Sequence, residues 1–280
     1  MSPTAITYPV LPAALGVLST PPDLAAGAAC PGDCASAEKL GFDFSFAFQP
    51  IVDLDARGVW GHEALVRGLH GEGAMSVLGQ VNEDNRYRFD QLCRIKALRE
   101  AVALGLQARL SLNFLPNAVY KPDICIRTTL EVARATGFPI GHIVFETTEG
   151  EQVHDKAWYA EVMREYKRIG FLTAIDDFGA GYAGLSLLAD FVPDIVKLDM
   201  ALLRGVEADA KRQAIVRHTT ALCRELGVSV VAEGVETAGE YGFLADLGIT
   251  LMQGYFFARP AFRALVPAQQ IAALQPPGAG

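Results

Sequence analysis

Short hydrophobic runs recur along the middle of the chain, and most are separated by longer segments with apolar residues at three- and four-residue spacing. The short runs predict β-strands and the longer segments predict helices. The predicted strands span residues 45–53, 58–68, 108–115, 142–148, 171–178, 194–199, 228–235 and 249–255. The predicted helices span residues 87–105, 122–136, 152–169, 181–190, 209–226 and 237–247.

This alternation of strands and helices is typical of an α/β fold of the (β/α)8, TIM-like barrel type. Glycines end or directly follow five of the predicted helices, where a helix C-terminal glycine belongs. Gly105 ends one helix, and Gly137, Gly170, Gly227 and Gly248 directly follow the others. An open doubly wound sheet is the alternative, but no glycine-rich phosphate-binding motif follows the first strands. The connection over residues 52–59 is too short for a helix, so the first two strands are predicted to form a hairpin, unlike those of an all-parallel barrel.

Polar residues lie near the C-terminal ends of the predicted strands, and in a barrel these ends converge on one mouth. They are Glu63, Asn113, Glu146, Asp176, Asp177, Lys197, Asp199, Glu233 and Gln253. Carboxylates gathered in one cavity repel one another unless cations lie between them. Oxygen donors without a histidine or cysteine cluster favour Mg²⁺ or Mn²⁺, whereas Ca²⁺ could occupy such a site without supporting the chemistry and is expected to inhibit.

The stretch "IDDFG" favours two metal ions, because one aspartate can bridge both while its neighbour binds the second. For Asp176 and Asp177 to reach the same site, the strand must break its alternation there, which the following Phe178-Gly179 makes plausible. Two such ions clamp the attacking and leaving oxygens of a phosphodiester in an in-line displacement. A nearby lysine, Lys197, can orient the attacking water.

Eight motifs occur in order between residues 44 and 265: "FQPIVD", "EALVR", "LSLNF", "FETTE", "AIDDFGAGY", "VKLD", "VAEGVET" and "MQGYFFARP". In this order they resemble the EAL-domain phosphodiesterases, which hydrolyse the bacterial messenger cyclic di-GMP to linear pGpG. The resemblance implies a barrel with its first strand reversed, in agreement with the predicted hairpin. It also implies a homodimer, since dimers are common in that family.

The resemblance further assigns roles to the polar residues. Ligands of the first metal would be Glu63, Asn113, Glu146 and Asp176. Asp176 would bridge to the second ion, which Asp177 helps to hold, and Glu233 would lie close to that ion and its water.

The remaining roles concern water, substrate and a loop. Lys197 would contact the nucleophilic water, and Gln253 would lie near water or substrate at the mouth. The substrate side would include Gln49, Leu65 and Arg67, with Arg67 offering a guanidinium fork to a phosphate. Asp199 is either a substrate contact or a structural acceptor. Glu149 would anchor the loop after the fifth strand.

Two alternatives to an active enzyme follow from the same family. One is a catalytically silent cyclic di-GMP receptor, although such proteins usually lack some of these acidic residues and none is missing here. The other is a protein-interaction regulator that uses the barrel as a scaffold. Ala183-Gly184 replaces two small hydroxylated residues that are common in the family, which bears on activation or dimer coupling more than on chemistry.

Composition adds limits on partners and location. The net charge of −8 and the isoelectric point near 5.2 argue against nonspecific nucleic-acid binding. No apolar run is long enough for a transmembrane helix, and no lysine or arginine precedes Lys39, so we expect a cytoplasmic protein. The predicted organisation is an extension with little regular structure over residues 1–40, a phosphodiesterase barrel over 41–268 and a tail over 269–280.

Cysteine usage indicates a reducing compartment, because five cysteines is an odd number in a chain long enough to fold without disulfides. Cys93, Cys125 and Cys223 are predicted to be small buried hydrophobic residues. Cys30 and Cys34 flank a turn; a redox or metal site is the alternative there, but we favour an incidental occurrence of the two cysteines. The N-terminal extension could bind a sensor or regulator.

Overall fold

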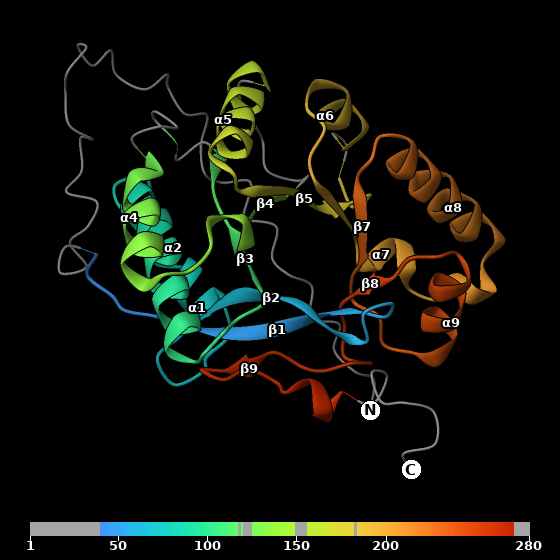
Figure 1. Ribbon diagram of the computed structural model, residues 1–280, viewed down its shortest axis with the longest axis horizontal. Coiled ribbons are helices and arrows are strands. Elements are labelled where there is room, and N and C mark those ends of the chain that lie inside the picture. The colour runs from blue at the N-terminus through green and yellow to red at the C-terminus, as the bar shows by residue number, and fades with distance from the viewer. Residues whose placement is uncertain (1–39, 117–118, 120–124, 149–155, 182–183, 272–280) are drawn as a thin grey trace.

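The structure is a computed structural model that describes residues 40–116, 119, 125–148, 156–181 and 184–271. The predictions for Glu149, for Cys30 and Cys34, and for the N-terminal extension lie outside these residues. Within them the chain forms a closed barrel of strands surrounded by helices (Figure 1).

A nine-stranded sheet runs through the described residues in the order β2-β3-β4-β5-β6-β7-β8-β1-β9, and pairing of β1 with β2 closes it. Its strands are β1 (Ser45–Asp53), β2 (Gly58–Arg67), β3 (Arg109–Asn113), β4 (Ile143–Thr148), β5 (Leu172–Phe178), β6 (Ile195–Leu198), β7 (Ser229–Ala232), β8 (Leu251–Met252) and β9 (Ala261–Phe262). Strands β2 to β8 run parallel, whereas β1 is antiparallel to both β2 and β8. The predicted TIM-like barrel with a reversed first strand is therefore confirmed.

Helices connect most of the parallel strands and lie outside the barrel (Figure 1). The α-helices are α1 (Met75–Leu78), α2 (Arg86–Ala103), α4 (Arg127–Thr136), α5 (Lys156–Ile169), α6 (Gly184–Asp190), α7 (Met200–Leu203), α8 (Ala210–Glu225) and α9 (Ala238–Asp246). Short 3₁₀ turns occupy Ile140–His142, Val206–Ala208 and Ala268–Gln270. The short elements α1, α7 and β9 were not predicted.

Local sequence explains both the hairpin and the helix ends. Asp53 Oδ1 accepts hydrogen bonds from the backbone N–H groups of Asp55 and Ala56, each at 3.0 Å, which closes the turn between β1 and β2. At the end of α4, Gly137 has a φ of 71°, in the left-handed region that favours glycine, and its N–H donates to the carbonyls of Ala133 and Arg134. The other four predicted helix-ending glycines also have positive φ.

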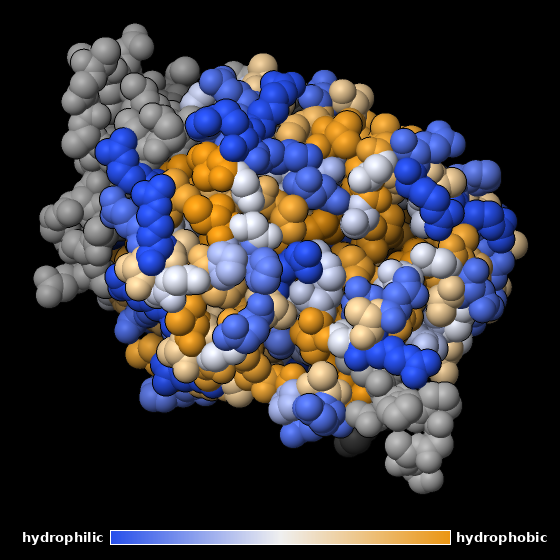
Figure 2. All heavy atoms as spheres, in the orientation of Figure 1, coloured by the Kyte–Doolittle hydropathy of each residue, from blue (hydrophilic) through white to orange (hydrophobic). Residues whose placement is uncertain are grey.

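Apolar packing occurs on both sides of the sheet. A large cluster fills the space between the strands and the helices. It includes Cys125 and Cys223, which are buried as predicted, and Cys93, which is only half-buried. A smaller cluster, which we call the apolar layer, lies inside the barrel and consists of Ile51, Val144, Ala174, Ile195, Val231 and Leu251. Figure 2 shows a hydrophobic area in the region of α6, where Leu185 is 66% exposed.

Candidate active site

Polar side chains form a second layer inside the barrel, next to the apolar layer. Side chains two residues apart on a strand point to the same face, so each apolar interior residue is paired with a polar one two positions away. Val144 precedes Glu146 in this way, and Ala174 precedes Asp176. We call this set the polar layer; it consists of Gln49, Glu63, Asn113, Glu146, Asp176, Lys197, Glu233 and Gln253.

The reversed strand β1 obeys the same geometry in the opposite direction. Ile51 lies opposite Gly61 of β2, and Gln49 lies opposite Glu63. Because β1 is antiparallel, its polar residue precedes its apolar one. The inverted hairpin therefore contributes to both layers without breaking either.

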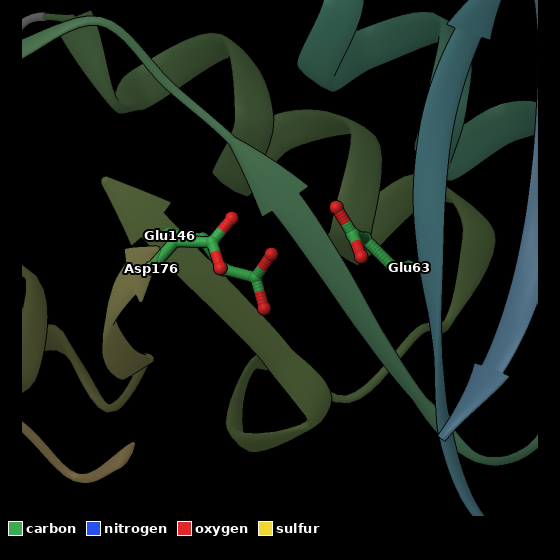
Figure 3. A group of neighbouring side chains, drawn as sticks. All are labelled: Glu63, Glu146 and Asp176. Atoms are coloured by element: carbon green, nitrogen blue, oxygen red, sulfur yellow. The ribbon is translucent and has the colours of Figure 1, made fainter. Parts of the chain in front are cut away.

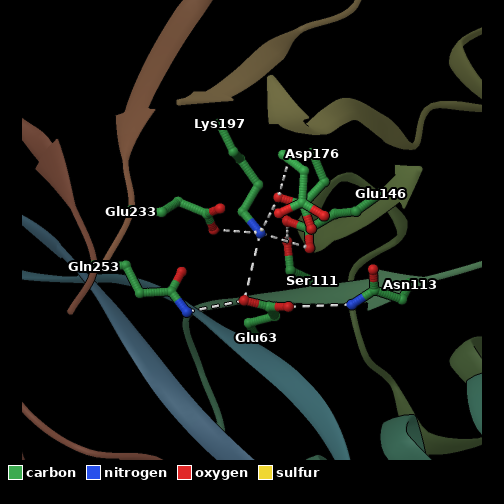
Figure 4. Close-up of polar contacts among 9 residues, drawn as sticks. Glu63, Ser111, Asn113, Glu146, Asp176, Lys197, Glu233 and Gln253 are labelled. Carbon is green, nitrogen blue, oxygen red and sulfur yellow. Dashed lines mark hydrogen bonds and ion pairs between the residues drawn. The ribbon is translucent and has the colours of Figure 1, made fainter. Parts of the chain in front are cut away.

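Lys197 lies at the centre of the polar layer and is 1% exposed (Figure 4). Its Nζ is 2.7 Å from Glu233 Oε1, 3.0 Å from Glu146 Oε2, 3.1 Å from Asp176 Oδ1 and 3.4 Å from Glu63 Oε2. Burial alone would lower the pKa of this lysine, but Asp176 and the other carboxylates raise its pKa well above the ordinary value. The carboxylates therefore stabilise Lys197 as a charged ammonium.

One ammonium cannot neutralise the carboxylates around it. Burial raises the pKa of Glu146 to about 8, and it raises the pKa of Glu233 well above its ordinary value. Burial together with the charge of Asp176 raises the pKa of Asp177 to about 7. These shifts have two physical causes: burial removes water from each carboxylate, and the neighbouring carboxylates repel its negative charge.

Hydrogen bonds fix the orientation of the acidic side chains (Figure 4). Glu63 accepts from Asn113 Nδ2 at 3.1 Å and from Gln253 Nε2 at 2.8 Å. Glu146 accepts a hydrogen bond from Ser111 Oγ. Sequence reasoning missed Ser111, although its position two residues before Asn113 on the same face of β3 was a usable signal.

The predicted break in strand alternation at the paired aspartates is present. Asp177 has a φ of 53°, in the left-handed region, and the pairing of β5 with β6 shifts register between Ile175 and Phe178. Asp177 N–H also donates to Asp176 Oδ1 at 2.9 Å. The irregular backbone lets both aspartates line the same cavity, instead of pointing to opposite faces.

Two groups of carboxylates have the proximity that a metal ion requires. One consists of Glu63, Glu146 and Asp176 (Figure 3), and the other of Asp176, Asp177 and Glu233. Within each group, one oxygen per residue lies within 4.8 Å of the others. Asp176 belongs to both groups, as expected for a bridging ligand. This all-oxygen donor set and its uncompensated negative charge fit hard divalent cations.

A cavity of about 750 Å³ opens beside the polar layer, a size suited to a small-molecule ligand. It is lined by carboxylates of both groups and by all five predicted substrate residues, which are Gln49, Leu65, Arg67, Asp199 and Gln253. Further lining residues were not predicted from the sequence; among them are Arg86, Asp90, Arg204, Glu236, Tyr255 and Arg259.

The predicted substrate residues differ in how much of their bonding capacity the protein already uses. Asp199 accepts from the N–H of Ala201 at 2.8 Å and so caps α7, which makes it a structural acceptor that also lines the cavity. Arg67 donates to the carbonyl of Val66 at 2.7 Å. Among the described residues no carboxylate forms an ion pair with Arg67, so its guanidinium is available to an anion.

The family model described as "EAL domain" matches residues 37–260. The chain belongs to the EAL domain family. A stand-alone EAL protein from Vibrio cholerae O395, solved in a c-di-GMP-bound form, is 53% identical; the match covers 81% of this chain and 95% of that protein, with a TM-score of 0.79. Klebsiella pneumoniae BlrP1, in a manganese and cyclic di-GMP complex, is 36% identical over 79% of this chain and 56% of BlrP1, with a TM-score of 0.74.

Curated relatives of this EAL protein include enzymes and a regulator. The cyclic di-GMP phosphodiesterase RocR of Pseudomonas aeruginosa is 30% identical over 78% of this chain. The blue light- and temperature-regulated antirepressor BluF of Escherichia coli is 34% identical over 76% of this chain. The chain spans 57% of the length of RocR and 53% of that of BluF. Within the described part of the EAL protein, no helix has the length and apolar character to cross a membrane.

Proposed function

We propose that this EAL protein is a metal-dependent phosphodiesterase that hydrolyses cyclic di-GMP to linear pGpG. The observation that carries the proposal is the buried polar layer, in which Lys197 contacts four carboxylates at the side of a ligand-sized cavity. RocR is named a cyclic di-GMP phosphodiesterase, and the Vibrio cholerae relative was solved with c-di-GMP. The site therefore has the chemical groups expected of such an enzyme, and the protein is related to chains that are named as such enzymes or were solved with this ligand.

Mg²⁺ or Mn²⁺ is the cofactor we propose, with Glu63, Asn113, Glu146 and Asp176 holding one ion and Asp176, Asp177 and Glu233 holding a second. Bound there, the ions would acidify a water molecule and polarise the phosphoryl oxygens. The relative BlrP1 has been solved in manganese and in calcium complexes. We expect Ca²⁺ to bind and to inhibit, since it is larger and coordinates more loosely than Mg²⁺.

The chain's own residues would hold and move protons around the reacting phosphate. Glu233 lines the cavity, and its carboxylate would accept a proton from the attacking water. Lys197 holds Glu233 in place and offsets its charge. The water oxygen forms a bond to phosphorus as its proton passes to Glu233, and the bond from phosphorus to the 3′-oxygen breaks. The 3′-oxygen takes a proton from solvent water and leaves as an alcohol.

Substrate positioning falls to the cavity wall. Arg67 can offer two parallel N–H donors to a phosphate, which fixes both its position and its orientation. Gln49, Leu65 and Asp199 line the same wall, and Gln253 holds Glu63. We propose that these residues fix the phosphodiester against the acidic groups.

A second candidate function is a regulator that acts by protein contact, with cyclic di-GMP bound but not hydrolysed. The relationship to BluF, which is named an antirepressor, favours it. The intact set of acidic residues favours the enzyme. Turnover decides between the two.

The test is hydrolysis of cyclic di-GMP by the purified chain with Mg²⁺ or Mn²⁺, with pGpG followed by chromatography. The matched variant is Asp176→Asn, which keeps the shape of the side chain and removes the charge shared by both metal groups. We expect linear product from the wild type, none from the variant and none in excess chelator. Product formation that survives Asp176→Asn would refute the proposed site.

Other features of the whole protein are also proposals. We propose that residues 41–268 form the phosphodiesterase barrel between an extension, 1–40, that binds a sensor or regulator, and a tail, 269–280. We propose a cytoplasmic location and a homodimer. Light scattering after size exclusion measures the mass of the particle in solution and so tests the homodimer.

A further inference from the structure

Arg86 is a buried cation in the wall of the cavity. It is the first residue of α2 and is 9% exposed. Its Nε is buried and has no hydrogen-bond partner. Nη2 lies 3.5 Å from the Tyr87 hydroxyl, and the guanidinium carbon lies 5.0 Å from the centre of the Tyr87 ring. Among the described residues, no carboxylate forms an ion pair with Arg86.

This position is unfavourable for a cation on two counts. Burial of a charged group without a partner costs free energy, and the N-terminus of a long helix such as α2 carries a positive partial charge. Asp90, one turn further along α2, lines the same cavity, but its carboxylate already bonds to Arg94 Nη2 and to the N–H of Leu115. The protein therefore offers Arg86 the hydroxyl and ring of Tyr87 but no carboxylate, which leaves its remaining donors for the acceptors of a ligand.

The surroundings of Arg86 suit a flat aromatic ligand group. Leu78, Val81 and Phe89 line the same cavity as Arg86 and add apolar surface to its wall. A cyclic dinucleotide has two phosphates and two bases, and the phosphates are already served by Arg67 and the metal groups under the proposed function. A base is the part of such a ligand that combines an apolar face with hydrogen-bond acceptors at its edge.

We propose that Arg86 recognises the O6 and N7 acceptors of one guanine and so selects guanine over adenine, an inference that rests on the proposed function. A guanidinium donates two parallel N–H bonds to O6 and N7 of guanine. Adenine has an amino group in place of O6, so one donor of Arg86 faces another donor. Arg86 is thereby a specificity-determining residue.

The test compares binding of cyclic di-GMP and cyclic di-AMP to the full chain by calorimetry, in Ca²⁺ so that substrate persists. Arg86→Met removes the fork and keeps an unbranched apolar side chain. It should weaken cyclic di-GMP binding by about 5- to 150-fold, the range for loss of a bidentate base contact. Cyclic di-AMP binding should change less than about twofold. Arg99→Met removes the same charge from an exposed position of α2 and should leave both affinities unchanged.

A measurement on the wild type avoids any dependence on how well a variant folds. Cyclic di-GMP with 7-deazaguanine bases lacks the N7 acceptor, so it should bind the wild type more weakly than cyclic di-GMP does. The Arg86→Met variant should bind the two ligands with equal affinity. Equal weakening of both nucleotides by Arg86→Met, or undiminished binding of the deaza ligand to the wild type, would overturn the inference. Binding with this pattern but without turnover in Mg²⁺ would instead refute the enzyme and leave the role of Arg86 standing.

Discussion

Replacement of Lys197 by methionine tests the idea that one ammonium stabilises the whole polar layer. Its Nζ contacts Glu63, Glu146, Asp176 and Glu233 within 3.4 Å, and the lysine is 1% exposed. Removal of one member of a buried ion pair typically costs about 3–5 kcal/mol, because the remaining charge stays buried without compensation. We expect Lys197→Met to lose about that much free energy of unfolding in the absence of divalent ions.

The pH dependence of that loss follows from the carboxylates. The pKa of Glu146 is already raised to about 8 in the wild type, and removal of the lysine raises it further. Protonation neutralises the layer, so the deficit of the variant should shrink as pH falls from 9 to 6. Divalent cations that bind the same carboxylates should stabilise the variant more than the wild type.

Urea unfolding followed by circular dichroism, in excess chelator and at several pH values, measures this loss. Lys167→Met is the matched control, since Lys167 pairs with Asp194 at 2.9 Å but is about a third exposed, and exposed pairs contribute about 0–1 kcal/mol. If Lys197→Met were as stable as the wild type at pH 9 in chelator, the carboxylates would not depend on the lysine and the electrostatic account would be wrong.

Two further predictions concern residues that the sequence did not mark as part of the site. Ser111→Ala removes the hydroxyl that donates to Glu146, and the loss of such a supporting bond typically lowers metal affinity or activity about 10- to 100-fold. A calorimetric titration with Mn²⁺ measures the metal affinity, and an unchanged affinity would exclude Ser111 from the site. Burial raises the pKa of Tyr166 from 10.0 to about 12, because it disfavours the charged phenolate. The free energy of unfolding should therefore be unaffected by this tyrosine below pH 10 and should fall by about 3 kcal/mol as pH rises to 12, since the unfolded chain loses the proton first. Tyr166→Phe should remove this part of the alkaline decline in urea unfolding, whereas an identical pH profile would contradict it.

Much of the barrel could be predicted because its signals are local and repeated. Apolar runs marked most strands, and glycines marked helix ends such as Gly137, because these features depend on neighbours in sequence. The paired aspartates also predicted a break in the alternation of their strand, and the positive φ of Asp177 confirms it. By contrast, β9 spans two residues and α1 spans four, too few for any periodicity to show.

The parts of the site that were missed depend on tertiary packing. A serine within an apolar strand is common, and only the closure of the barrel places Ser111 against Glu146. Arg86 stands in "NRYRFD", a stretch that reads as an ordinary charged helix start. Its burial arises because α2 packs against the barrel beside the cavity, which no spacing in the sequence encodes.

The arrangement of the barrel interior in two layers has a consequence for how proteins of this fold diverge. The apolar layer fills part of the barrel interior without charge, while the polar layer concentrates like charges that resist burial. Substitution of an acidic residue by a neutral one therefore relieves repulsion and is expected to leave the fold intact or to strengthen it. Loss of catalysis is then a downhill step in stability, so mutational drift towards inactive members needs no compensating change, and activity persists only where selection maintains it.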